Sequence, residues 1–170
     1  MDFNQLAKER YSCRKFSDKK VDDSLIMQII ETANKAPTAV NKQPVRVFWL
    51  KSDNAKAAIK KATVYDFGAP TFLVVGYKES EGWVRPYDNR AFADVDGSIV
   101  ATHIMLALKD LGLDTTWVGY FNPDVLKEIY PEMKDYNLIA IFPIGYKAVD
   151  GTPSPRHEQR KALNDFYTEL

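Results

Sequence analysis

The longest predicted helix, from about Ala91 to Leu111, constrains the fold more than any other sequence feature. Its centre, IVATHIMLAL from Ile99 to Leu108, is apolar on almost every side. Gly112 follows it as a typical residue just beyond a helix C-terminus. An all-apolar helix is buried within a domain or between subunits. We therefore expect this helix to be central, or to lie in a subunit interface.

The other predicted elements do not alternate as strict βαβ units, because two helices precede the first strand. Helices are expected at 2–9, 22–36, 52–62 and 123–130, and strands at 45–50, 71–77 and 137–145. Residues 115–121 should form a strand or a strand-to-loop unit, and 160–170 a short helix or a strand. The runs TFLVVGY and NLIAIFPIG are nearly continuous apolar stretches, typical of strands buried on both faces. This order predicts an α+β sandwich.

Composition limits the class of protein. The 170 residues suit a single domain spanning 1–170. With 23 basic and 23 acidic side chains, bulk attraction to nucleic acid is not indicated. One cysteine and two histidines argue against a metal centre. No apolar run approaches the ~20 residues that span a bilayer, and no signal-peptide core begins the chain. We expect a cytoplasmic protein with no membrane or nucleic-acid partner.

A basic segment follows the first helix at residues 10–15, with the sequence RYSCRK. Alternate residues of an extended chain share a face, so Arg10, Ser12 and Arg14 should point the same way. Two guanidinium groups and a hydroxyl suit a phosphate, with a solvated basic turn as the alternative. Cys13 should point the opposite way as a small buried side chain; thiol chemistry beside the arginines is the alternative.

Two further segments carry groups suited to a planar ligand. The loop APTAVNKQP at 36–44 offers the amides of Asn41 and Gln43, which can read the edge of a heterocycle or merely satisfy the loop's own backbone. The segment TWVGYF at 116–121 places Gly119 among aromatic residues, where a ligand can approach the backbone closely. A buried strand with a bulge is the alternative there.

The C-terminal region predicts an extended arm. Residues 147–159 hold two prolines and few apolar groups, and we expect this arm to wrap a second subunit. The basic cluster at 156–161 either completes an anion site or is a solvated tail. Within the long helix, Asp94 and Asp96 are explained by the helix dipole, and His103 is interpreted as a core histidine.

In this order, the segments resemble the nitroreductase family of FMN-dependent oxidoreductases over nearly the whole chain, as a short member. The matching motifs are Arg10-x-Ser12-x-Arg14 with Phe16, Ala36-Pro37-Thr38-Ala39-x-Asn41-x-Gln43-Pro44, Gly112-Leu113-x-Thr115-Thr116-Trp117-Val118-Gly119, and Arg160-Lys161-x-Leu163. The chain departs from the family pattern at Val45, often Trp, and at Ala39, often a small polar residue.

The resemblance implies a three-layer sandwich with a mainly antiparallel central sheet flanked by helices. It implies an intertwined homodimer with FMN at each end of the interface and the arm 147–170 exchanged with the partner subunit. The residues that it assigns to FMN binding are Arg10, Tyr11, Ser12, Arg14, Pro37, Thr38, Ala39, Asn41, Trp117, Val118, Gly119 and Arg160. The loop from Pro37 to Asn41 would reach the partner's FMN, and Lys161 is a nearby substitute for Arg160.

The implied reaction is a ping-pong exchange, in which NADH or NADPH reduces FMN and an electron-poor acceptor, such as a nitroaromatic or a quinone, reoxidises it. No protein group is assigned as catalytic, and Arg14 would stabilise the reduced flavin. Residues 80–90, with Trp83, Tyr87 and Arg90, are the candidates for a reduced lid. The alternative is a non-catalytic flavin-binding or ligand-sensing dimer.

Overall fold

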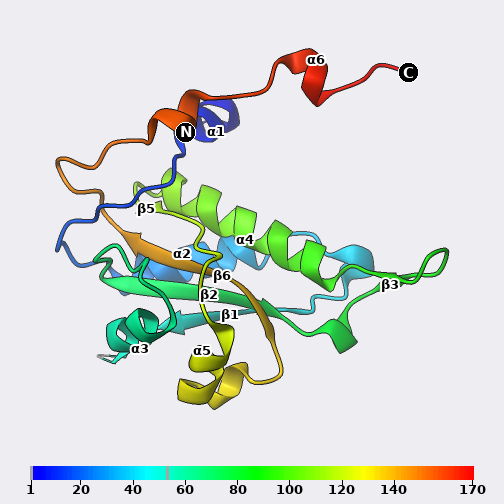
Figure 1. The fold of residues 1–170 in the computed structure, drawn as a ribbon, viewed down its shortest axis with the longest axis horizontal. Coiled ribbons are helices and arrows are strands. Elements are labelled where there is room, and N and C mark those ends of the chain that lie inside the picture. Colours follow the sequence, from blue (N-terminus) through cyan, green and yellow to red (C-terminus); the bar gives the residue numbers. More distant parts are fainter. Residues whose placement is uncertain (1, 53) are drawn as a thin grey trace.

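The central sheet has four strands in the order β1-β2-β6-β5, and all neighbouring strands run antiparallel (Figure 1). The computed structural model describes residues 2–52 and 54–170. The strands are β1 (Val45–Leu50), β2 (Thr71–Tyr77), β6 (Asn137–Gly145) and β5 (Asp114–Thr115). The interior of β2, from Phe72 to Gly76, is buried on both faces, as its continuous apolar run predicts.

Helices cover both faces of the sheet. Leu73 and Val75 face a core built with α2 (Asp23–Ala33) and α4 (Ala93–Asp110). The alternate residues of β2 face a second core, with α3 (Ala55–Ala62) and α5 (Pro123–Ile129). The predicted three-layer α+β sandwich is therefore confirmed (Figure 1).

The long helix α4 packs beside α2 on one face of the sheet and contacts β1, β2 and β6. Val100, Ala101 and Ile104 on its inner side are buried. On its outer side Thr102 is exposed and Leu106 is only partly buried, so one apolar face of the helix stays partly open in a single chain. The helix is central, as expected, and Gly112 follows it with φ +76°.

Several local predictions are confirmed and others are wrong. Asp2 caps α1 (Phe3–Glu9), and Asp22 caps α2. The third helix begins at Ala55 rather than near 52, where the sequence offers Ser52 or Asp53 as its N-cap; Asp53 lies outside the described residues. The closing helix is only one turn, α6 (Leu163–Phe166). Short 3-10 turns are η1 (Ala39–Asn41), η2 (Glu79–Glu81), η3 (Pro131–Met133) and η4 (Pro155–Glu158).

The segment 115–121 is a strand-to-loop unit, the second of its two predicted forms. The chain pairs with β6 only through β5, leaves the sheet, and returns at Val118, which forms an isolated bridge with Ile141. The residues between these two pairings are free to line a pocket. The region 78–89, in which Gly82, Pro86 and aromatic residues predict an exposed loop, contains part of a small hairpin formed by β3 (Val84–Arg85) and β4 (Arg90–Ala91).

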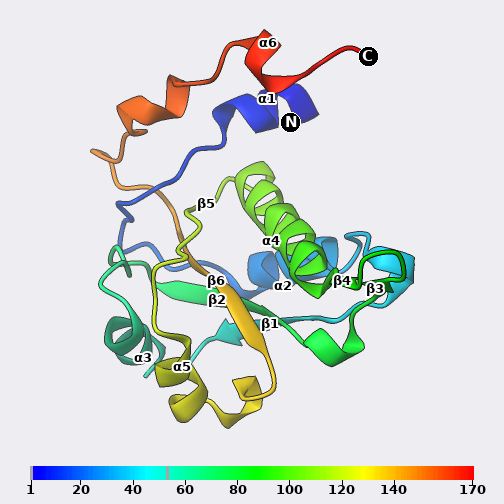
Figure 2. The same ribbon diagram turned by 45° about the vertical axis from the view of Figure 1, so that its right-hand side comes forward.

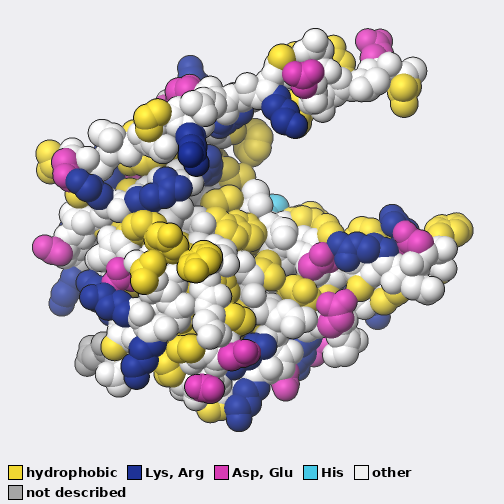
Figure 3. Space-filling model, viewed as in Figure 1, with side chains coloured by type: hydrophobic (Ala, Val, Ile, Leu, Met, Phe, Trp, Pro, Cys, Tyr) yellow, Lys and Arg dark blue, Asp and Glu magenta, His cyan; other side chains and the backbone are white. Residues whose placement is uncertain are grey.

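The C-terminal arm leaves the sandwich beside the N-terminus. Figure 2 shows η4 and α1 side by side, with α6 beyond them. The space-filling view shows a hollow between the end of the arm and the hairpin, with hydrophobic side chains over α4 along its floor (Figure 3). Large apolar side chains of the arm are exposed, namely Leu163, Phe166, Tyr167 and Leu170. In the part of the chain that the structure describes, no helix has the length and hydrophobicity to cross a membrane.

Candidate functional site

An extended segment places the first group of predicted site residues. Residues 11–16 run beside the sheet edge, where Ser12 bridges Thr115 and the Cys13 amide donates to the Thr115 carbonyl at 2.9 Å. Because side chains alternate along it, Arg10, Ser12 and Arg14 line one cavity, as predicted. Cys13 points the other way and is fully buried, which raises the pKa of its thiol.

That cavity, here called the anion cavity, has a volume of about 590 Å³ and is strongly basic. Its lining residues are Arg10, Ser12, Arg14, Ser154, Arg156, His157 and Arg160. Among the described residues, none of these four guanidinium groups forms an ion pair with a carboxylate. Burial, and after it the charge of Arg160, lowers the pKa of Arg10. Like charges held together without a counterion are suited to bind an anion.

The arm is fixed where it enters the anion cavity. The His157 ring lies edge-on to Tyr11 at 6.2 Å between centroids, and its Nε2 is 3.3 Å from the Lys8 carbonyl oxygen. Arg160 donates to the carbonyl of His157 at 2.5 Å and to that of Gln159 at 2.8 Å. Three residues of the basic cluster, Arg156, His157 and Arg160, therefore line the anion cavity, as the first of its two interpretations expects. Lys161 does not line the cavity.

A second pocket, of about 330 Å³, adjoins the first through Arg14, which lines both. Its other lining residues are Tyr65, Phe67, Thr116, Trp117, Val118, Gly119 and Tyr120, and we call it the aromatic pocket. Trp117 packs edge-on against Phe142 at 5.5 Å. A Cβ at Gly119 would meet only ordinary contacts with Trp117, so packing within the chain does not require glycine. Its missing side chain leaves room for a ligand instead.

Two aromatic residues of this pocket, Tyr65 and Phe67, are not predicted from the sequence. Tyr65 stacks on Phe67 with ring centroids 5.7 Å apart and meets Tyr120 edge-on at 5.9 Å. Phe67 has φ +50°, rare for a bulky residue, and such strain concentrates at functional sites. The only available signal was two aromatic residues spaced two apart before Gly68.

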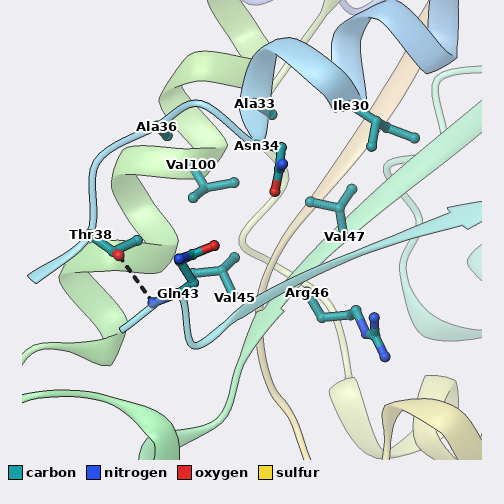
Figure 4. A pocket seen from close by; sticks show the side chains of 10 residues that line it. All are labelled: Ile30, Ala33, Asn34, Ala36, Thr38, Gln43, Val45, Arg46, Val47 and Val100. Atoms are coloured by element: carbon teal, nitrogen blue, oxygen red, sulfur yellow. Dashed lines mark hydrogen bonds between the residues drawn. The ribbon is translucent and has the colours of Figure 1, made fainter. Parts of the chain in front are cut away.

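The loop from Pro37 to Gln43 has a strained backbone that two hydrogen bonds fix in place. Val40, Asn41 and Gln43 all have positive φ, at 43°, 58° and 52°. The backbone amide of Gln43 donates to Thr38 Oγ1 at 3.0 Å, which is the dashed line in Figure 4. Both residues line a separate cavity of about 250 Å³. The Ala39 amide donates to Asp96 Oδ1 at 2.8 Å. Asp96 is 1% exposed, so it anchors this loop in addition to any effect of the helix dipole.

Within one chain, the loop and the anion cavity lie at opposite ends of α4. Asp96 holds the loop near the start of the helix, whereas Lys109, near its end, lines a small gap together with Arg10. Lys109 follows Asp96 by 13 residues, and a rise of about 1.5 Å per residue places the two about 20 Å apart along the helix. The hairpin, like the loop, lies at the N-terminal end of α4, where Arg90 forms an ion pair with Asp94 at 2.8 Å.

The predicted site residues therefore fall into three groups: those that line the two adjoining pockets, those of the loop, and Tyr11. Arg10, Ser12, Arg14 and Arg160 come together with Trp117, Val118 and Gly119, whereas Pro37, Thr38, Ala39 and Asn41 lie apart from them. The side chain of Tyr11 is buried beside Cys13 and His157 and does not line the anion cavity.

Comparison with known proteins identifies the family of the chain. A family model described as the nitroreductase family matches residues 7–67 and 65–146. A nitroreductase family protein from Clostridium difficile is 34% identical, with a TM-score of 0.90 over 99% of this chain and 98% of that one. The FMN complex of a predicted nitroreductase from Exiguobacterium sibiricum is 22% identical, with a TM-score of 0.84 over 100% and 98%. The chain belongs to the nitroreductase family.

A further relative matches this chain in its sequence. A predicted NADH dehydrogenase/NAD(P)H nitroreductase of Methanothermobacter thermautotrophicus is 26% identical over 157 residues. The match covers 87% of this chain and 78% of that protein.

Proposed function

We propose that this protein is an FMN-dependent oxidoreductase that works as a homodimer, with NADH or NADPH as electron donor. The observation that carries the proposal is the anion cavity, joined through Arg14 to an aromatic pocket. The cavity has four arginine side chains, and no carboxylate of the described residues pairs with them. A phosphate on a flat aromatic ring system is the ligand that such a pair of pockets suits. The names of the relatives, which include an FMN complex and an NAD(P)H nitroreductase, support the choice of FMN and of donor.

The residues present fit FMN. Arg10, Ser12 and Arg160 would hold the phosphate, because bidentate guanidinium groups and a hydroxyl match its oxygens. Trp117 and Gly119 would lie beside the ring, where the missing Cβ gives it room. When bound, FMN supplies the electron transfer between donor and acceptor. Arg14, which borders both pockets, would stabilise negative charge that develops on the ring, so the protein contributes position and electrostatics.

A second copy would complete each site. A two-fold axis would bring the loop Pro37–Asn41 of one chain to the anion cavity of the other, since the two lie at opposite ends of α4. Exchange of the arm 147–170 would cover its exposed apolar side chains, among them Leu163 and Phe166. The strained loop, anchored on Asp96, would then be preorganised for the partner's cofactor. Tyr11 would contribute through its backbone, because its side chain is buried.

The hairpin would form the remaining lid, also from the partner. It lies at the same end of α4 as the loop, and Tyr87 at its tip is 95% exposed. Arg85 holds the turn through two bonds to Asp88, at 2.8 and 2.5 Å. A shallow ring face beneath such a short lid suits electron-poor small molecules, such as nitroaromatics and quinones.

The visible spectrum of the purified protein tests this proposal. We expect flavin bands, or uptake of added FMN, and loss of these bands when NADH or NADPH is added without oxygen. Bound flavin that neither donor reduces would leave only a non-catalytic flavin-binding dimer. A protein that takes up no FMN would contradict the proposal.

A further inference from the structure

A third hollow, of about 550 Å³, adjoins the aromatic pocket and has no role in the proposed function. Gly119 and Tyr120 line both of these spaces, just as Arg14 lines both the anion cavity and the aromatic pocket. The anion cavity and the third hollow share no lining residue. The three spaces therefore form a series with the aromatic pocket in the middle. The residues that line the third hollow are Ala62, Gly119, Tyr120, Phe121, Asn122 and Pro123.

Tyr120 supplies the one side chain that borders both the aromatic pocket and the third hollow, because the other shared residue is a glycine. It is 77% exposed, whereas Tyr65, the ring that it meets edge-on at 5.9 Å, is 42% exposed. Hydrogen bonds fix the backbone around it. The Thr63 hydroxyl donates to the Tyr120 carbonyl at 2.6 Å, and the Asn122 amide donates to the Ala62 carbonyl at 2.9 Å. Tyr120 therefore holds an open aromatic ring on a fixed backbone.

The third hollow suits an uncharged aromatic group. All of its lining residues are uncharged, and Ala62, Phe121 and Pro123 give it apolar walls. Of the three spaces, the anion cavity and the aromatic pocket are the two that arginine side chains line. The pyrophosphate of NADH or NADPH binds best to such positive groups, so the third hollow does not suit the donor. A neutral acceptor that reaches the flavin can instead extend past it onto Tyr120.

We infer that Tyr120 and the third hollow form an acceptor subsite, which favours neutral acceptors with two fused rings over those with one ring. This inference rests on the proposed function. One ring of such an acceptor would reach the aromatic pocket, where the flavin would lie, and the second ring would pack against Tyr120. An aromatic pair of this kind tightens binding by about three- to tenfold beyond simple burial. Tyr120 is thus a residue that determines specificity and takes no part in electron transfer.

Equilibrium titration of oxidised, FMN-loaded protein tests the subsite without turnover. Nitrobenzene and 1-nitronaphthalene, which differ by one fused ring, are added separately, and each Kd is taken from the change in the visible flavin spectrum. We expect Tyr120→Ala to weaken the binding of 1-nitronaphthalene by about three- to tenfold and that of nitrobenzene by less than about twofold. Tyr120→Phe keeps the ring and should restore the wild-type Kd of 1-nitronaphthalene.

Phe3→Ala is the matched control, because Phe3 is an exposed aromatic residue on α1 that lines none of the three spaces. It should change neither Kd. A Tyr120→Ala variant that weakens both compounds equally, or neither of them, would overturn the inference alone, as would FMN-loaded wild-type protein that binds neither compound. Loss of FMN from Tyr120→Ala would also overturn it, by placing Tyr120 at the flavin itself. A protein that takes up no FMN would overturn the proposed function and this inference together.

Discussion

Replacing Arg10 by glutamine should move protein stability and FMN affinity in opposite directions. The guanidinium of Arg10 is partly buried near Arg160, and burial and that charge lower its pKa. No carboxylate among the described residues pairs with either group. In the FMN-free protein the two guanidinium groups repel each other, and such an interaction between partly exposed charges costs about 0.2–1 kcal/mol.

Glutamine keeps part of the aliphatic stem and a polar end but removes the charge. The unfolding free energy of FMN-free protein should therefore stay unchanged or rise by up to about 1 kcal/mol, a Tm increase of about 2–4 °C for a chain of this length. FMN binding should weaken, because a hydrogen bond to a charged group contributes about 1.5–3 kcal/mol. That loss corresponds to a roughly 10- to 150-fold larger Kd.

Thermal unfolding without FMN and titration of FMN fluorescence measure the two effects separately. Arg46→Gln, which removes an exposed charge outside the proposed site, should leave both unchanged. A lower Tm with unaltered FMN affinity would refute the reasoning, because Arg10 would then have a structural partner rather than a ligand.

Other parts of the account make separate predictions. Asp96→Ala removes the acceptor of the Ala39 backbone amide and should weaken FMN binding by about tenfold. Asp96→Asn keeps an acceptor and should bind FMN more tightly than Asp96→Ala. Equal FMN affinity of the wild type and both variants would exclude the loop from the site. Burial raises the pKa of the Cys13 thiol above 9.0, so the unfolded chain ionises first as the pH rises. The free energy of unfolding in urea should therefore fall above about pH 9, and less steeply in Cys13→Ala; identical pH profiles would contradict this. A chain ending at 161 keeps Arg160 but loses four exposed apolar side chains of the arm, and it should be monomeric by light scattering; a dimer of unchanged mass would argue against arm exchange.

The features predicted correctly are those that depend on local patterns. The continuous apolar runs of β2 and β6 identify strands buried on both faces, and alternation along 10–14 places Arg10, Ser12 and Arg14 on one cavity. These predictions succeed because periodicity and side-chain direction are properties of a few consecutive residues.

The features missed depend on contacts between distant segments. The sequence leaves open whether 115–121 is a strand or a strand-to-loop unit, because the choice depends on β6, which pairs with β5 at one place and with Val118 at another. Asp96 has the sequence pattern of a helix start, and only the fold brings it within reach of the Ala39 amide, 57 positions away. Tyr65 and Phe67 likewise join the aromatic pocket through tertiary packing, which no local pattern encodes.

Complementation between two defective chains tests the composite site most directly. One chain carries Arg10→Gln with Arg160→Gln, and the other carries Asp96→Ala; each alone should retain little FMN. In a randomly mixed two-fold dimer population, about a quarter of all sites combine an intact anion cavity with an intact loop. The account predicts that co-expression restores FMN content and flavin reduction to about a quarter of the wild-type level. Flavin content no higher than the average of the two separate variants would contradict a site built from two subunits.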